Sequence, residues 1–114
     1  MRVAFRGVRG SVPWDVPAAS AHGCNTACIE IVGDSGRILV LDAGSGIVGV
    51  TPPPTAPSVA LLLTHYHWDH VLGLPFFAPL YDPRLPLTLH APTLPAYDPR
   101  WLEIVFHEPF YPLP

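Results

Sequence analysis

The residues best suited to chemistry in this sequence are three histidines and a carboxylate within six positions, His65, His67, Asp69 and His70. They follow an uncharged run, residues 58–63, that indicates a buried strand. Alternate side chains share a face in an extended segment, so His65, His67 and Asp69 are expected to converge, while His70 leaves in another direction as the chain turns. Imidazole suits zinc, iron and manganese, and a carboxylate favours harder ions. The stretch predicts a metal site with two neighbouring ligand pairs.

The other histidines and the two cysteines lack such spacing. His22, His90 and His107 have no partner residues at ligand spacing, and histidines outside a motif are usually ordinary. Cys24 and Cys28 match no strong metal or redox template, and free cysteines are usually small interior side chains. We assign no chemistry to these five residues.

Short strands separated by turns are the elements that must position the histidines. Apolar or alternating runs predict strands at residues 2–6, 25–32, 37–41, 58–63 and 85–90, with a short helical piece at 47–50. The turn sequence Asp34-Ser35-Gly36 joins the second and third of these strands in an antiparallel hairpin. Residues 7–23, rich in glycine, proline and alanine, indicate a long surface loop, and loops of that length are often functional.

A helix is expected directly after the histidines. Asp69 is placed to cap it, and the helix would carry Val71, Leu72 and Leu74 into the core. Gly73 and Pro75 imply that its first turn is short or bent. The histidine stretch is thus expected to be a loop that joins a strand to a helix.

Composition limits the class of protein. The chain has 114 residues, of which 49% are apolar and only 13% charged, which excludes a disordered tail. So little charge on so small a domain indicates an apolar face that a missing half or a partner covers. A net charge of −3 gives no general attraction to nucleic acid. The N-terminus lacks a signal-peptide core, and four prolines between residues 52 and 57 would break a membrane span, so a cytoplasmic protein without membrane contact is expected.

The histidine stretch resembles a known signature. His65-Tyr66-His67-Trp68-Asp69-His70 after a buried strand is similar to the HxHxDH motif of the metallo-β-lactamase superfamily, and Leu41-Asp42-Ala43-Gly44-Ser45-Gly46 resembles that superfamily's upstream aspartate-glycine motif. Arg9-Gly10-Ser11-Val12-Pro13 and Gly23-Cys24-Asn25-Thr26 look like the phosphodiesterase branch, which is related to the tRNA 3′-processing ribonucleases and to cyclic-nucleotide phosphodiesterases. So does the segment 70–77.

The resemblance implies an α/β (α+β) fold. Residues 1–114 would form a single domain, the N-terminal half of a four-layer αββα sandwich, with a mostly antiparallel mixed sheet. The second half is expected to be absent from this chain, so the implied partner is a second half-domain chain or another copy in a homo-oligomer.

The resemblance also implies roles for individual residues. His65 and His67 would bind one divalent metal ion, and Asp69 and His70 the second, with zinc expected first and manganese or iron as alternatives. Asp42 would support the loop from behind by hydrogen bonding, as metal ligands require. The family's remaining ligands lie downstream of its first half.

The implied function is that of a metal-dependent hydrolase, a phosphodiesterase that acts through a hydroxide activated by two metal ions, with Asp69 orienting the nucleophile. Its substrate would be a phosphodiester small molecule or a nucleotide, and RNA belongs to the same class. Two alternatives stay open. One is a thioester or lactam hydrolase of the same superfamily, and the other is an inactive truncated or split half-domain that needs a partner.

Overall fold

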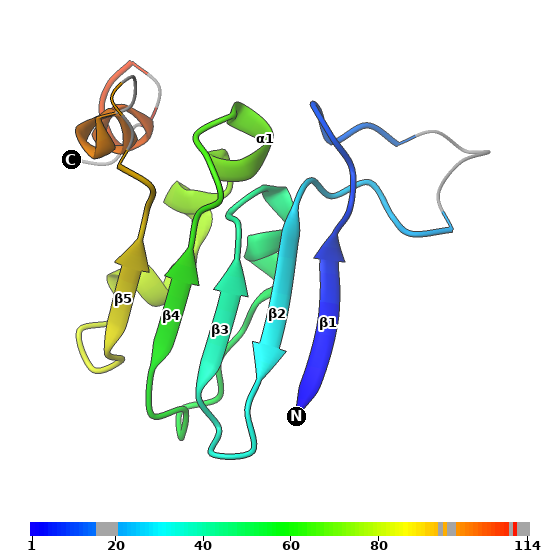
Figure 1. Cartoon of the computed structure of the whole chain (residues 1–114), viewed down its shortest axis with the longest axis vertical. Helices are drawn as coiled ribbons and strands as arrows, with labels where there is room; N and C mark the ends of the chain where they lie inside the picture. The colour runs from blue at the N-terminus through cyan, green and yellow to red at the C-terminus, as the bar shows by residue number, and fades with distance from the viewer. Residues whose placement is uncertain (16–20, 94, 96–97, 110, 112–114) are drawn as a thin grey trace.

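A five-stranded mixed sheet organises the chain, as the computed structural model shows for residues 1–15, 21–93, 95, 98–109 and 111 (Figure 1). Its strands are β1 (Arg2–Gly7), β2 (Cys28–Val32), β3 (Ile38–Leu41), β4 (Val59–Leu62) and β5 (Leu87–His90). The order across the sheet is the order along the chain. β1, β2 and β3 pair antiparallel, whereas β4 and β5 are added parallel to β3.

One face of the sheet is covered by short helical segments (Figure 1). These are the 3₁₀ helix η1 (Ser45–Gly49), α1 (Trp68–Val71), and the 3₁₀ helices η2 (Leu74–Phe76), η3 (Ala78–Tyr81) and η4 (Pro99–Phe106). Cross-strand partners point to the same face, and the central positions of this face are almost fully buried: Ile38, Val40, Val59 and Leu61. Phe77, Ile47 and Leu74 pack on them from the helical side as part of the same core.

Glu30 is the one acidic residue of β2, and it lies on the covered face with only 2% of its surface exposed. Arg6 donates two hydrogen bonds to its Oε2, from Nε at 2.9 Å and from Nη2 at 2.6 Å, and Arg2 lies 3.5 Å from the same oxygen. A buried carboxylate needs such pairing, because an unpaired buried charge is strongly destabilising. The ion pair ties the edge strand β1 to β2.

The opposite face of the sheet is apolar and open. It carries two rows of cross-strand neighbours, Val3-Ile31-Leu39-Ala60-Thr88 and Phe5-Ile29-Leu41-Leu62-His90. Phe5 is 70% exposed, and neither row contains an aspartate, glutamate, lysine or arginine. The uncharged face predicted from composition is therefore present on this sheet.

The sequence located the elements to within a few residues. The mixed α/β architecture, the hairpin at residues 34–36 and the helical piece near residues 47–50 are confirmed. The second strand begins at Cys28 and not at Asn25, because Asn25 and Thr26 are used in contacts with neighbouring loops. The expected loop at 7–23 is described as far as residue 15 and again from residue 21.

The helix after the histidines is shorter than expected and is capped differently. α1 has four residues, and its N-cap is His67, so the prediction that Asp69 caps this helix is wrong. Asp69 lies in the first turn, and its carboxylate accepts a hydrogen bond from another part of the chain. Val71 is buried in the core as expected, Leu72 is only half-buried at the end of α1, and Leu74 reaches the core from η2.

Length and hydropathy together rule out a membrane-crossing helix among the residues that the structure describes.

Candidate metal centre

The histidine loop lies at the end of the sheet where the parallel strands finish. It runs from the end of β4 into α1, and α1 stands beside the turn that follows β3 (Figure 1). Backbone hydrogen bonds join the two segments, from Ala43 N to His70 O at 2.8 Å and from Gly73 N to Ala43 O at 2.9 Å. Gly44 approaches so closely that a Cβ there would lie 2.3 Å from the carbonyl oxygen of Asp69. The turn after β3 thus forms the floor on which the histidine loop rests.

The three histidine rings gather at this point. The ring centroids of His65 and His67 are 4.4 Å apart in an edge-on arrangement, and those of His65 and His70 are 4.1 Å apart. His70 was expected to leave in a different direction, and that expectation is wrong because the turn of α1 returns its ring to His65. The Oδ2 atom of Asp69 lies 3.6 Å from Nε2 of His70.

Asp42 and Thr64 determine which nitrogen His65 presents. Thr64 donates to Asp42 through its backbone N–H, at 2.8 Å, and through its hydroxyl, at 3.0 Å. Nδ1 of His65 lies 2.9 Å from the same hydroxyl oxygen. Because the hydroxyl has one hydrogen and gives it to the carboxylate, its oxygen accepts from Nδ1. Nε2 of His65 then carries the lone pair, which is the form that binds a metal ion.

Asp42 also lies beside His70. Its Oδ2 is 2.9 Å from Nδ1 of His70, close enough for an ion pair but without the alignment of a hydrogen bond. The backbone of Asp42 has a φ of +63°, in the left-handed region that few non-glycine residues adopt. Asp42 is only 7% exposed. Its buried carboxylate lies directly beside His70 and is linked to His65 through the Thr64 hydroxyl. This is the supporting position expected for it.

The residue types and one separation fit a divalent metal ion. Two ligands of a tetrahedral zinc ion, each about 2.0–2.2 Å from it, stand roughly 3.4 Å apart. The 3.6 Å between Nε2 of His70 and Oδ2 of Asp69 is close to that value. Within the described parts of the chain, no three histidine, cysteine, aspartate or glutamate side chains are arranged to hold an ion together. The described side chains therefore fit a metal ion as pairs of ligands, such as His70 with Asp69, and not as a set of three.

The electrostatic surroundings favour the ligand forms of these side chains. Partial desolvation, followed by repulsion from His70 and His67, lowers the pKa of His65, so its ring is neutral at a lower pH than an ordinary histidine. The backbone amide of Ser11 is the first cause that lowers the pKa of Asp69, against the effect of desolvation. A neutral imidazole and an ionised carboxylate are the states that bind metals.

Residues that the sequence left aside have structural roles. The hydroxyl of Tyr66 donates to the carbonyl oxygen of Pro92 at 2.7 Å. Both cysteines are free, and burial raises the pKa of the Cys28 thiol to about 12, so Cys28 is an inert interior residue as expected, while Cys24 is half-buried. The side chain of Asn25 accepts a hydrogen bond through Oδ1 from the Ser45 hydroxyl, at 3.1 Å.

Thr64 and the amide of Ser11 are the site features that the sequence did not reveal. The position of Thr64, between a strand and His65, was a usable signal for the first of them. The Ser11 amide gave no signal in the sequence, because every residue except proline has a backbone N–H.

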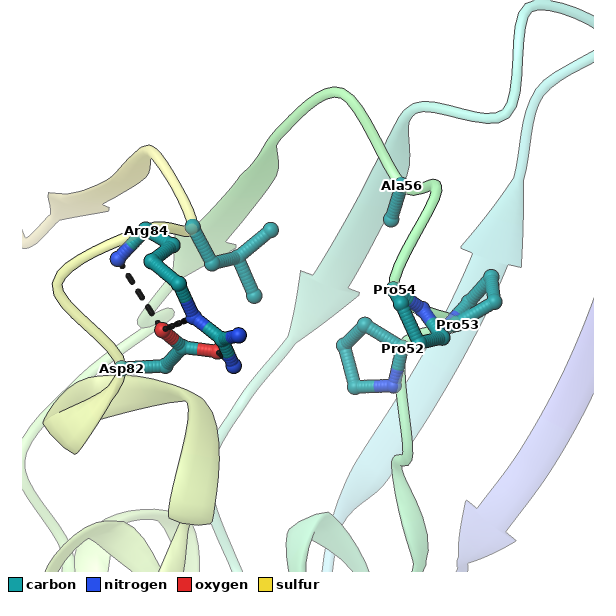
Figure 2. A pocket seen from close by; sticks show the side chains of 7 residues that line it. Pro52, Pro53, Pro54, Ala56, Asp82 and Arg84 are labelled. Carbon is teal, nitrogen blue, oxygen red and sulfur yellow. Dashed lines mark hydrogen bonds and ion pairs between the residues drawn. The ribbon is translucent and has the colours of Figure 1, made fainter.

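A separate pocket lies at the other end of the parallel strands. It has a volume of about 200 Å³ and is lined by Pro52, Pro53, Pro54, Ala56, Asp82, Arg84 and Leu85 (Figure 2). These residues precede β4 and β5, whereas the histidines follow β4. Arg84 donates to Asp82 at 2.9 Å and 3.0 Å, so the charges that face this pocket neutralise each other. The pocket is not part of the histidine site.

Residues 21–113 match the family model of the metallo-beta-lactamase superfamily, and this match includes the whole histidine loop and the turn containing Asp42. The chain belongs to the metallo-β-lactamase superfamily. Members of this superfamily are generally hydrolases and typically bind divalent metal ions, so the family indicates a metal-dependent hydrolase. No curated protein and no solved structure matches the chain. The five-stranded sheet covered on one face is consistent with part of a metallo-β-lactamase fold.

Proposed function

We propose that this chain carries the metal-binding loop of a phosphodiesterase, with His65, His67, Asp69 and His70 as ligands of two divalent metal ions. The observation that carries the proposal is the gathering of three imidazole rings and a carboxylate above a common support. That support is Asp42, which contacts Thr64 and His70 and through Thr64 orients His65. A buried carboxylate beneath more exposed ligands is expected where metal ligands must be held in a fixed orientation.

Each ligand has a role that follows from its surroundings. Divalent ions, when bound, supply the positive charge that acidifies water and neutralises charge developing on the attacked group. His65 is oriented through Nδ1, and Nδ1 of His70 lies beside the Asp42 carboxylate, so both histidines would bind through Nε2. Asp69 stays ionised in contact with the Ser11 amide, and it would hold the attacking water by accepting one of its protons.

A phosphodiester is the proposed substrate class because of the segments that surround the site. The two segments that resemble the phosphodiesterase branch, residues 9–13 and 23–26, are separate in the sequence but paired in space through an isolated bridge between Arg9 and Thr26. Ser11 extends this pair to Asp69. These contacts support the proposal, since they bring the branch-like residues to the histidine loop. The proposal includes zinc as the first metal and a partner polypeptide or a second copy as the source of further ligands.

The test combines metal binding with a panel of substrates. The purified chain is titrated with Zn²⁺ and Mn²⁺ and then assayed with bis-p-nitrophenyl phosphate, a thioester and a cephalosporin. We expect metal binding that is lost in His67→Ala and retained in His107→Ala, and hydrolysis of the phosphodiester alone. Hydrolysis of only the thioester or the cephalosporin would replace the phosphodiesterase proposal by a carbonyl hydrolase, and identical metal binding by both variants would remove the assigned site.

A further inference from the structure

The segment that follows β1 reaches the histidine loop across 58 residues of sequence. The backbone N–H of Ser11 donates to Oδ2 of Asp69 at 2.9 Å. This is the same oxygen that lies 3.6 Å from Nε2 of His70. Ser11 precedes the region matched by the family, residues 21–113. The contact therefore reaches Asp69 from outside the residues that the family model matches.

Ser11 is held in a backbone conformation that serine rarely adopts. Its φ is +69°, and Val12 N donates to Gly10 O at 2.9 Å, so Ser11 is the central residue of a three-residue turn with positive φ. A non-glycine residue in this region costs of order 1–3 kcal/mol, and such residues persist only where their surroundings hold them. The turn points the Ser11 amide outward to Asp69 instead of into a local hydrogen bond.

A chain of contacts fixes this turn to the frame of the site. Val8 N and Arg9 N both donate to Asn25 O, at 3.1 Å and 3.0 Å. Thr26 and Ser45 then exchange two hydrogen bonds, from Thr26 N to Ser45 Oγ at 2.9 Å and from Ser45 N to Thr26 Oγ1 at 2.8 Å. Ser45 is the first residue of η1, directly after the turn that carries Asp42. The amide of Ser11 and the carboxylate of Asp42 are thus parts of one connected frame, in which Asp42 lies beside Nδ1 of His70 and Asp69, held by Ser11, lies on the Nε2 side.

We infer that Ser11 is a positioning residue whose backbone amide fixes the carboxylate of Asp69 for metal binding. The inference rests on the proposed function, because it assigns the amide to a ligand of that site. An N–H bond to one carboxylate oxygen restricts rotation of the side chain, and a ligand that is already oriented loses less entropy when it binds. The serine hydroxyl has no part in this role, so the amide alone is the group to test.

The experiment replaces one atom. A backbone ester at position 11 substitutes oxygen for the N–H and leaves the side chain unchanged. The full chain can be assembled by ligation at the junction of Gly23 and Cys24, with the ester in the synthetic segment 1–23. Controls are Ser11→Ala and Ser11→Gly, which keep the amide, the second also removing the cost of positive φ, and Gly10→Ala, whose Cβ meets nothing within 4 Å. Affinity for Zn²⁺ and the absorption spectrum of the Co²⁺ form are measured for each.

We expect the ester to weaken Zn²⁺ binding by about tenfold or more, the range seen when groups that orient metal ligands are removed. It should also change the Co²⁺ spectrum, while the melting temperature without metal stays near that of the parent chain. The three controls should bind within about twofold of the parent, because the ligand-orienting amide is intact. If the parent chain binds zinc and the ester variant binds it with equal affinity, the inference about Ser11 is overturned while the proposed function stands. A parent chain that binds no zinc would overturn the proposed function, and the inference with it.

Discussion

Asp42 and Thr64 are the residues through which the site can be probed without touching a proposed ligand. The Thr64 hydroxyl stands between the Asp42 carboxylate and Nδ1 of His65, so removing it releases His65 alone. Removing the charge of Asp42 affects both His65 and His70, because Oδ2 of Asp42 also lies beside His70. The two residues should therefore differ in the size of their effect.

We expect Thr64→Val to weaken Zn²⁺ binding by about tenfold and Asp42→Asn by closer to 100-fold, the range found for groups that orient metal ligands. Asparagine tolerates the positive φ of position 42, so the second variant changes the charge and keeps the backbone. Affinities are measured by competition with a chromophoric chelator. The matched control is Thr51→Val, at an exposed threonine away from the histidines. Equal affinities for Thr64→Val and the control would contradict the relay through Thr64.

Sequence reasoning singled out the proposed ligand residues and missed how two of them are held. His65, His67, Asp69 and His70 were recognisable because four ligand-type residues in six positions have no packing explanation. The role of the Ser11 amide could not be predicted from the sequence, since a backbone N–H donor is common to nearly all residue types. The positive φ of Ser11 and Asp42 was equally hidden, because neither is a glycine. The wrong assignment of Asp69 as a cap follows from this, as local capping and a distant amide compete for the same carboxylate.

At the scale of elements, the turn after β3 and the start of η2 are packed backbone against backbone. A Cβ on Gly73 would lie 2.2 Å from the carbonyl oxygen of Gly44 and 2.7 Å from Ile47 Cγ2. Gly73 N donates to Ala43 O, so the close approach is part of the contact that seats α1. Only glycine permits this spacing between the two segments.

We expect Gly73→Ala to lower the free energy of unfolding by about 1–3 kcal/mol, because the clash is with backbone that cannot move aside. It should also disturb metal binding, since α1 carries Asp69 and His70. Gly49→Ala is the control, as a Cβ there meets nothing within 4 Å. Chemical denaturation of both variants gives the comparison. A Gly73→Ala protein as stable as the Gly49→Ala protein would show that the two segments separate more readily than their contacts indicate.

Strand positions were predictable from the sequence for a simple physical reason. Residues 38–41 and 59–62 are apolar throughout, which predicts strands that are apolar on both faces, and both strands lie between two neighbours in the sheet. Strand ends were less predictable. Asn25 and Thr26 continue the alternating pattern of β2, yet they leave the ladder to bind Ser45 and its neighbours, which is a tertiary preference that a local pattern does not contain.

At the scale of the whole molecule, the uncovered face of the sheet is the main apolar surface left exposed to solvent. Its two cross-strand rows present apolar side chains from β1 to β4 and end in Thr88 and His90 on β5, and Val3, Phe5 and Leu62 are exposed. A contiguous apolar patch on a small domain is a site of interaction. Sheets pack face to face, so a second sheet is the layer that suits it, from a partner polypeptide or from a second copy.

We expect the chain alone to self-associate through this face. The double variant Phe5→Lys with Leu62→Lys places two charges on exposed positions of the face, and it should be monomeric with little loss of stability. The control double variant is Val48→Lys with Phe76→Lys, which changes two exposed apolar residues of the helical side. Sedimentation velocity over a concentration series distinguishes them. A monomeric parent chain, or dissociation by both double variants alike, would contradict an interface at this face.

The order of the strands in the sheet has a consequence for how the protein is made. Because each strand lies beside its predecessor in the chain, the sheet can grow by addition at one edge while synthesis proceeds. The β2 and β3 hairpin closes the shortest loop and should form first, and pulse-labelled hydrogen exchange should find its amides protected before those of β5. Earlier protection of β5 would contradict this sequence of events. The turn that carries Asp42 is synthesised before the histidines. The nascent chain would therefore already contain the residue that supports the histidine loop when His65 to His70 are added.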